Sequence, residues 1–587
     1  MITKAQTIAI PRETLARARA AADAAPRHSG LRYNLGVMLH EANDAVGAAA
    51  AYAQATRLKP DFFQAWNNLG LALEDVNRTD EAVRAFRQAL AVRPDYPAAL
   101  KNLGRLLAVA GDVEAARVCY RRLGELEPGN WAARITAALM LPAVYDSSEA
   151  LATVRERFST ELEALIAQAR TPAGTAEQRL NALELHNNFF LAYQGEDDRE
   201  LQAGYARLTR RLLGDACPEL HGPRPLSVTG RMRVGFASCF LRDCTVGHYF
   251  RSWITDLDPG RFEVWVYLLG GPEDAVTETI RQAAFNTVRV EGSLPQAARA
   301  ILDSAPDVLV YPELGMNGRT YALAAMRLAP VQCAGWGHPV TSGHRTVDYF
   351  LSCAAMEPED GDSHYIESLV RLPGMGTRYA KADVGTTLSR TDLGLPEAAH
   401  LYLFPHAPCK IHPENDALVA GILAADPAGV LVLCDGFVPG QGRMLRQRLE
   451  TALAERGVTP NRLRMLPHLP RASFLEANRL CDVMLDTTRW SGGNTTLDAL
   501  AAGLPVVTRR GRFMRGRQSA GMLEFIGLPE LIAQNDDDYV DIALRLGRDK
   551  HWRDEVSCRI AAGRERLFDD RAPVAALAAF FLTLRKP

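Results

Sequence analysis

The chain has 587 residues, too many for one hydrophobic core, and we expect roughly three or four domains. Its net charge of -2 gives no whole-chain attraction to nucleic acid or to an anionic membrane, so neither is expected as a partner. No apolar run reaches the roughly 18 residues of a membrane-spanning helix, and the first residues lack the apolar stretch of a secretory signal. The ten cysteines are scattered without a CxxC pair. We therefore expect a cytoplasmic protein that holds no metal.

The first part of the chain repeats with a period of 34 residues. The tripeptide Asn-Leu-Gly recurs at this spacing, as do a proline, an alanine and an aromatic residue. This period, with small residues where two antiparallel helices meet, is typical of tetratricopeptide (TPR) repeats. We predict an all-α TPR solenoid over residues 1–140, with three full repeats at 27–128 and capping helices on either side.

The asparagines of the recurring tripeptide, Asn34, Asn68 and Asn102, are candidate contacts for a partner. Each lies on the first helix of its repeat. A primary amide donates and accepts at once, so a ladder of amides can hold a peptide backbone without reading its sequence. Alternatively, each asparagine only braces the turn between its helices. The pattern alone leaves both interpretations open.

Residues 141–225 have a helical pattern without recognisable chemistry, and we expect a helical connector. Beyond it, short apolar runs alternate with helical stretches, which predicts two doubly wound parallel sheets in Rossmann-like halves at 226–390 and 391–587. The expected strands lie at 233–237, 264–269, 308–311, 331–336 and 349–353, and at 401–404, 430–434, 463–466, 483–486 and 505–508. No dinucleotide fingerprint or P-loop follows a strand, which argues against dehydrogenases and ATPases. Among the enzymes built on two Rossmann-like domains, this leaves nucleotide-sugar transferases as the expected class, by analogy of fold.

A strand end, a glycine-containing loop and the start of a helix follow one another at 486–498. Gly493 and Asn494 lie in the loop, and Thr495 and Thr496 stand where the first free amides of the helix point outward. Such a turn is a ready anion site for a diphosphate. Asp498, in the first turn, can accept hydrogen bonds from two vicinal ribose hydroxyls. The alternative is a strand-to-helix turn that a threonine merely caps.

Lys410 follows the strand expected at 401–404. A lysine at the carboxyl end of a strand can neutralise the same diphosphate. A lone lysine is equally compatible with a solvated surface position.

The sequence resembles the O-GlcNAc transferase and SPINDLY-type protein glycosyltransferases from residue 27 to about residue 580. Besides the Lys410 and 492–498 segments, the most specific segments are Arg-Leu-Ala-Pro-Val-Gln at 327–332, Trp-Gly-His-Pro-Val-Thr-Ser-Gly at 336–343 and Asp-Tyr at 348–349; Phe-Met-Arg-Gly-Arg at 513–517 looks like the bacterial branch. The resemblance implies a GT-B-type pair of Rossmann-like domains, the N-terminal half on the acceptor side and the C-terminal half binding the nucleotide sugar. It also implies a UDP-GlcNAc-like donor as co-substrate, no metal or other cofactor, and transfer with inversion to Ser or Thr of a protein.

The resemblance also assigns residues. In this family the residue matching Lys410 contacts the diphosphate, the one matching Asp498 holds the ribose, and Thr495 lies in the phosphate-binding turn. The predicted donor site is completed by Gly493, Asn494, Thr496 and Arg517. The asparagine ladder is a family feature for acceptor peptides, so Asn34, Asn68 and Asn102 are predicted to bind a protein acceptor in the TPR groove.

One position departs from the family pattern. Bacterial relatives commonly have Asp-His-Thr-Val-Gly after the first strand, whereas residues 243–247 here read Asp-Cys-Thr-Val-Gly, with Cys244 in place of the histidine. A thiol of ordinary pKa is a poor general base for a hydroxyl. Either His248 supplies the imidazole, or the leaving group and solvent make a base dispensable, or the transferase activity is lost. His338 and Glu313, both at strand ends, are further catalytic candidates.

Two alternatives to this function stay open. Some bacterial proteins with a TPR array and this transferase region modify flagellin with nonulosonic acids from a CMP donor, so flagellin is one candidate acceptor. In the other, the α/β region is catalytically inactive and the TPR array serves as a scaffold for partners.

Overall fold

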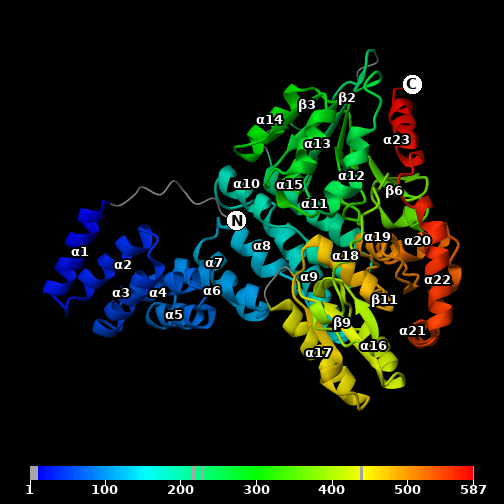
Figure 1. Cartoon of the computed structure of the whole chain (residues 1–587). Coiled ribbons are helices and arrows are strands. Elements are labelled where there is room, and N and C mark those ends of the chain that lie inside the picture. The colour runs from blue at the N-terminus through cyan, green and yellow to red at the C-terminus, as the bar shows by residue number, and fades with distance from the viewer. Residues whose placement is uncertain (1–10, 215–219, 221, 227–228, 437–439, 586–587) are drawn as a thin grey trace. The chain divides into compact units, whose positions relative to one another are not determined.

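The computed structural model describes residues 11–214, 220, 222–226, 229–436 and 440–585 (Figure 1). The first ten residues of the predicted array and the last two of the predicted C-terminal half lie outside this part. The chain divides into two compact units, Met1–Met140 and Leu141–Pro587. The predicted connector and both α/β halves therefore belong to one unit.

The first unit is a stack of antiparallel helices. Its helices are α1 (Arg12–Ala24), α2 (Ser29–Glu41), α3 (Ala45–Leu58), α4 (Phe63–Asp75), α5 (Thr79–Val92), α6 (Pro97–Ala110), α7 (Val113–Leu126) and α8 (Trp131–Leu139). A Cβ atom on Gly36 or Gly70 would lie 2.6 Å from the ring of Tyr52 or Phe86 in the next helix. The recurring glycine therefore lets the two helices of a repeat approach closely, and the predicted TPR solenoid is confirmed.

The second unit begins with the connector helices α9 (Ser148–Gln168), α10 (Ala176–Leu185) and α11 (Arg199–Leu213), with the 3-10 helix η1 (Phe189–Gln194) between the last two. η1 leaves the helical layer and joins an aromatic cluster with residues of both α/β halves: Tyr193 packs with Val340 and Trp490.

The first sheet is parallel, with the order β3-β2-β1-β4-β5-β6-β7. Its strands are β1 (Met232–Ser238), β2 (Phe262–Leu268), β3 (Asn286–Arg289), β4 (Val308–Tyr311), β5 (Val331–Gly335), β6 (Tyr349–Cys353) and β7 (Ser368–Leu372), and its helices are α12 (Thr245–Thr255), α13 (Ala275–Ala283), α14 (Leu294–Asp303) and α15 (Gly318–Ala324). The five predicted strands are present, and the edge strands β3 and β7 were not predicted.

The second sheet is also parallel, with the order β10-β9-β8-β11-β12-β13. Its strands are β8 (His400–Phe404), β9 (Gly429–Cys434), β10 (Leu463–Leu466), β11 (Val483–Leu485), β12 (Val506–Arg509) and β13 (Ile532–Ala533), and its helices are α16 (Asn415–Ala425), α17 (Gln441–Glu455), α18 (Arg471–Leu480), α19 (Asn494–Ala501), α20 (Gln518–Phe525), α21 (Asp536–Arg548) and α22 (Lys550–Gly563). The predicted pair of Rossmann-like domains is thus confirmed.

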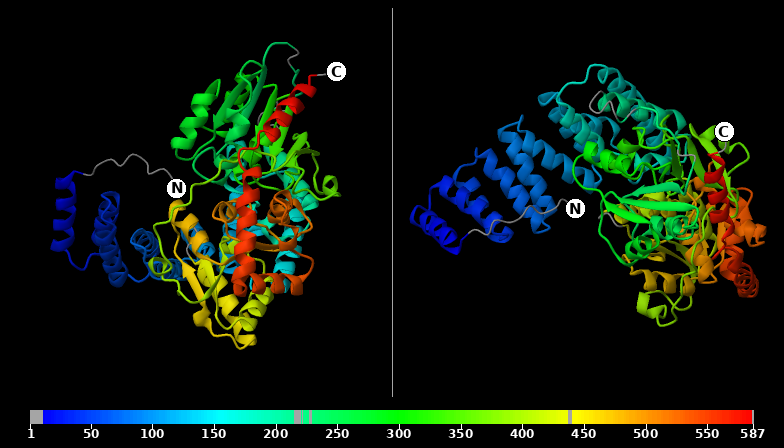
Figure 2. Two further views of the ribbon diagram at one scale, coloured as in Figure 1. Left: turned by 45° about the vertical axis from the view of Figure 1, so that its right-hand side comes forward. Right: turned by 90° about the horizontal axis from the view of Figure 1, so that it is seen from above.

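The predicted boundary of the C-terminal half needs a correction. The helix α23 (Ala572–Thr583), placed by the prediction in the 391–587 half, packs on α12 and β7 of the first half (Figures 1 and 2). Its Phe581 is fully buried near Phe262 of β2, and Arg585 pairs with Asp307 at 3.0 Å. The apolar face of α23 therefore completes the core of the first half.

Candidate functional site

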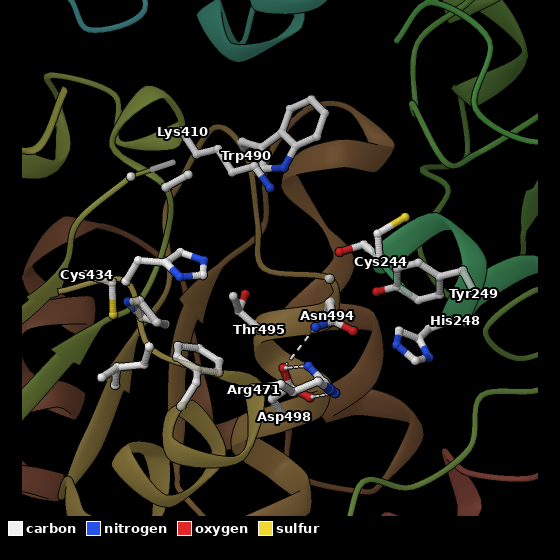
Figure 3. Close-up of a pocket in the computed structure, with 18 of the residues that line it drawn as sticks. Cys244, His248, Tyr249, Lys410, Cys434, Arg471, Trp490, Asn494, Thr495 and Asp498 are labelled. Carbon is white, nitrogen blue, oxygen red and sulfur yellow. Dashed lines mark hydrogen bonds and ion pairs between the residues drawn. The ribbon is translucent and has the colours of Figure 1, made fainter. Parts of the chain in front are cut away.

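A cavity of about 470 Å³ lies between the two halves of the second unit, lined by loops at the carboxyl ends of strands from both sheets (Figure 3). The first half contributes residues 243–245, 248 and 249 after β1 and residues 336, 337 and 339 after β5. The second half contributes Lys410 after β8, loops after β9 and β10, and the start of α19. Ligands of open α/β sheets bind in this position.

The start of α19 is an open anion cradle. The buried Asp486 carboxylate accepts the Ser491 hydroxyl at 2.6 Å and the Gly492 N–H at 2.7 Å, which fixes the loop before the helix. No acceptor in the described part of the chain takes the N–H groups of Asn494, Thr495 and Thr496. Unpaired amides at a helix N-terminus favour an anion.

Asp498 lies behind this cradle and is already paired. Its carboxylate, 1% exposed, accepts Arg471 bidentately at 2.7 and 3.0 Å and the side-chain amide of Asn494 at 2.9 Å. Burial raises the pKa of Asp498, and the Arg471 guanidinium offsets part of the rise. Asp498 thus stands in a charged cluster facing the cavity, and its predicted contact with a ribose stays a prediction.

Lys410 lines the opposite side of the cavity, in the 3-10 helix η5 (Pro408–Lys410). Its Nζ lies 5.5 Å from the ring centroid of Trp490 and 5.9 Å from that of Tyr193. Burial lowers the pKa of Lys410, and no carboxylate among the described residues pairs with it. A cation without a counter-ion beside free amides can balance an anionic ligand.

The first half brings Cys244 and His248 to the cavity (Figure 3). The Cys244 thiol donates to the Phe240 carbonyl at 3.2 Å, and burial raises its pKa, so it is a poor base at neutral pH. The Nε2 atom of His248 lies 2.8 Å from an Asp243 carboxylate oxygen. The Asp243 carboxylate therefore orients the imidazole of His248 at the cavity.

Four of the residues predicted for donor binding or catalysis do not line the cavity. The Thr496 hydroxyl lies 2.7 Å from that of Ser519 in the interior, and Arg517 donates to the Gly511 carbonyl at 3.3 Å. His338 is 2% exposed and stacks on Phe189, and burial lowers its pKa to about 3. Glu313 is buried beneath Gly337. The side chains of these four residues therefore do not line the cavity, whereas the N–H group of Thr496 belongs to the anion cradle; the roles predicted for the four residues stay predictions.

The buried Glu313 gives a pH prediction. Burial raises its pKa to about 8 from the ordinary 4.5, so the folded protein binds the extra proton between these values and loses stability as pH rises through them. Glu313→Gln removes this loss. As pH rises to 8, we expect the difference in unfolding free energy between Glu313→Gln and the wild type to grow in favour of the variant, by at most about 1.4 kcal/mol per pH unit. Above pH 8 the difference should level off. Urea unfolding between pH 5 and 9 measures this, and a difference independent of pH would contradict it.

The three ladder asparagines belong to the first unit. Asn34 is exposed, whereas Asn68 donates to the Tyr33 hydroxyl at 3.2 Å and Asn102 donates to the Asn67 side chain at 3.1 Å. Two of the three amides therefore already link neighbouring repeats, and acceptor binding by this row stays a prediction.

Several cavity residues were not among the predicted site residues, namely Tyr249, Trp336, Arg471, Phe474, Trp490 and Gln518. Trp336 and Trp490 nevertheless lie in the 336–343 and 486–498 segments that the sequence points to. Arg471 and Phe474 follow β10, whose predicted carboxyl end pointed to this loop. Tyr249 and Gln518 carry no such signal, because only the folded chain shows which face of a helix meets the cavity.

Comparison with known proteins gives two family matches. A model described as glycosyl transferase family 41 matches residues 375–577, and a tetratricopeptide repeat model matches 11–62, 47–78 and 67–129. Two plant proteins named probable UDP-N-acetylglucosamine–peptide N-acetylglucosaminyltransferase SPINDLY are similar. The one from Solanum lycopersicum is 27% identical over 54% of this chain and 34% of its own, and the one from Arabidopsis thaliana is 28% identical over 54% and 35%. The matches span about a third of the length of these relatives.

A solved structure of a mutant Thermobaculum terrenum O-GlcNAc transferase shares the fold. It superposes with a TM-score of 0.63 at 24% identity and covers 98% of each chain. In the part of this chain that the structure describes, no helix is long and apolar enough to cross a membrane. With TPR repeats ahead of a family 41 glycosyltransferase region, the resemblance of this chain to the O-GlcNAc transferase and SPINDLY type is confirmed.

Proposed function

We propose that the protein is an inverting glycosyltransferase that moves a sugar from a UDP-GlcNAc-like donor to a Ser or Thr hydroxyl of a protein acceptor. The observation that carries the proposal is the cavity lined by both Lys410, which has no carboxylate partner among the described residues, and Asn494 and Thr495, whose N–H groups are free. The names of the plant relatives, which specify UDP-N-acetylglucosamine and a peptide, support the same donor and acceptor classes.

The reaction is a displacement at the anomeric carbon. The acceptor oxygen forms a bond to this carbon while the bond to the diphosphate oxygen breaks. The departing diphosphate takes up negative charge, which the Lys410 ammonium and the α19 amides stabilise. No metal or other cofactor enters this scheme.

The acceptor hydroxyl must lose a proton, and His248 is the proposed base. Asp243 accepts a hydrogen bond from the His248 Nε2–H, and in this tautomer Nδ1 of the neutral ring can take the proton. The raised pKa of Cys244 argues against the thiol in this role. The TPR array is proposed to bind the acceptor protein.

Thermal unfolding of the full chain with UDP, CMP and GDP, and with their common sugar conjugates, tests the donor class. A nucleotide that binds only the folded protein stabilises it by about 2.7 kcal/mol at 100 times its Kd. We expect UDP and UDP-GlcNAc to raise the Tm. A shift with CMP alone would replace the donor by the CMP-sugar alternative, and no shift with any nucleotide would favour the scaffold alternative.

A further inference from the structure

The hydroxyl of Tyr249 is a buried polar group without a partner inside the cavity wall. Tyr249 lies on α12 and is 4% exposed, and no group in the described part of the chain hydrogen-bonds to its hydroxyl. The ring is fixed by Trp336 at a centroid distance of 4.7 Å and by Tyr379 at 5.3 Å. A buried hydroxyl in native proteins is normally hydrogen-bonded, so an unpaired one facing a cavity indicates a ligand atom.

This hydroxyl meets the anion cradle of the other half. A Cβ atom on Gly493, the residue before α19, would lie 2.7 Å from the Tyr249 oxygen. The free N–H groups of residues 494–496 follow directly. Figure 3 places Tyr249 across the pocket from Lys410, with Asn494 and Thr495 between them. A hydroxyl from the first half and amides from the second half therefore border the same space.

Several of the groups around this space are donors, namely the Tyr249 hydroxyl, the free N–H groups at the start of α19 and the Lys410 ammonium. Burial raises the pKa of Tyr249, so its hydroxyl keeps its proton at physiological pH. The nearby Asp498 carboxylate is held by Arg471 and Asn494 and does not accept from Tyr249. A group with several acceptor oxygens and no protons of its own, such as a diphosphate, fits these donors.

We propose that the Tyr249 hydroxyl donates a hydrogen bond to a phosphate oxygen of the diphosphate bound at α19. This inference rests on the proposed function and extends it, because it makes the N-terminal half, predicted to serve the acceptor, a ligand of the donor diphosphate as well.

Tyr249→Phe removes the hydroxyl and keeps the ring contacts. We expect the ligand-free variant to have the same Tm as the wild type or a higher one, because a lone buried hydroxyl destabilises the folded state. Its affinity for UDP is expected to fall about 10-fold or more, as for a lost hydrogen bond to a charged group. Isothermal titration with UDP and with UDP-GlcNAc measures this.

Tyr311→Phe is the matched control. The Tyr311 hydroxyl at the end of β4 is also buried and unpaired, but Tyr311 does not line the cavity. We expect the control to keep the Tm or raise it and to leave UDP affinity unchanged.

The outcomes separate the two proposals. Equal losses of UDP and UDP-GlcNAc affinity in Tyr249→Phe support the phosphate contact. Unchanged affinity in Tyr249→Phe, or a loss confined to UDP-GlcNAc, overturns the phosphate contact. The proposed function is then retained as long as the wild-type protein binds UDP and UDP-GlcNAc. A wild-type protein that binds neither ligand overturns the proposed function and the contact with it.

Discussion

Lys410→Ala is expected to lower kcat of sugar transfer at least about 100-fold, the usual effect of removing one group that stabilises developing negative charge. The Lys410 ammonium lies over the packed rings of Tyr193 and Trp490 and has no carboxylate partner among the described residues, so an anionic ligand is the counter-charge available to it in the cavity. UDP affinity should fall as well. Removal of a desolvated, unpaired cation should leave the Tm unchanged or raise it.

The measurement combines single-turnover transfer to an acceptor with UDP titration. Lys381→Ala is the control, because Lys381 pairs with Glu565 on the surface and does not line the cavity. Unchanged turnover in Lys410→Ala would remove Lys410 from the mechanism. A large loss of Tm would instead mean that the lysine is structural.

Arg471→Met is expected to destabilise the protein by about 2–4 kcal/mol, because it leaves the buried Asp498 carboxylate without its charged partner. Asp498 is 1% exposed, and in the variant it keeps only the hydrogen bond from Asn494. Asp498→Asn combined with Arg471→Met should be less destabilised than Arg471→Met alone, since the amide carries no charge. Urea unfolding of Arg471→Met, Asp498→Asn and the double variant measures the coupling.

The stability of Arg471→Met should depend on pH. Burial already raises the pKa of Asp498 above 3.8, and loss of Arg471 raises it further. The folded state then binds a proton that the unfolded state releases, so the variant regains stability as pH falls through the raised pKa. Arg446→Met, which breaks an exposed ion pair with Glu450, should change stability by less than about 1 kcal/mol. An equal loss of unfolding free energy in Arg471→Met at acid and at neutral pH would contradict the expected pH dependence.

The central strands could be predicted from the sequence, and the missed strands show why the others could not. β3, β7 and β13 all lie at sheet edges. In β3 and β7, with the sequences Asn-Thr-Val-Arg and Ser-Leu-Val-Arg-Leu, the first and fourth residues are exposed and the two between them are half-buried, whereas β4 is buried along its whole length. A continuous apolar run marks a strand covered on both faces, and β3 and β7 lack this signal. The edge strand β10 was predicted, because three of its four residues, Leu-Arg-Met-Leu, are apolar. β13 has only two residues.

Site residues could be predicted where they follow the carboxyl end of a predicted strand, which is where open α/β sheets bind ligands. This rule identified Lys410 and the 493–498 segment, from which Gly493, Asn494, Thr495 and Asp498 line the cavity together with Lys410. It also selected Glu313 and His338, which follow strands but are covered by neighbouring loops. The partner of Asp498 lies 27 residues earlier in the chain, and no local pattern pairs these two residues.

The return of α23 to the first half means that the chain passes twice between the halves. The two passages lie side by side, because Tyr379 pairs with Phe568 and the Asp569 N–H donates to the Tyr379 carbonyl at 3.0 Å. A ribosome makes α23 only after the whole second sheet, so β7 and one face of α12 stay uncovered until then. The half that is synthesised first is thus the last to complete its fold.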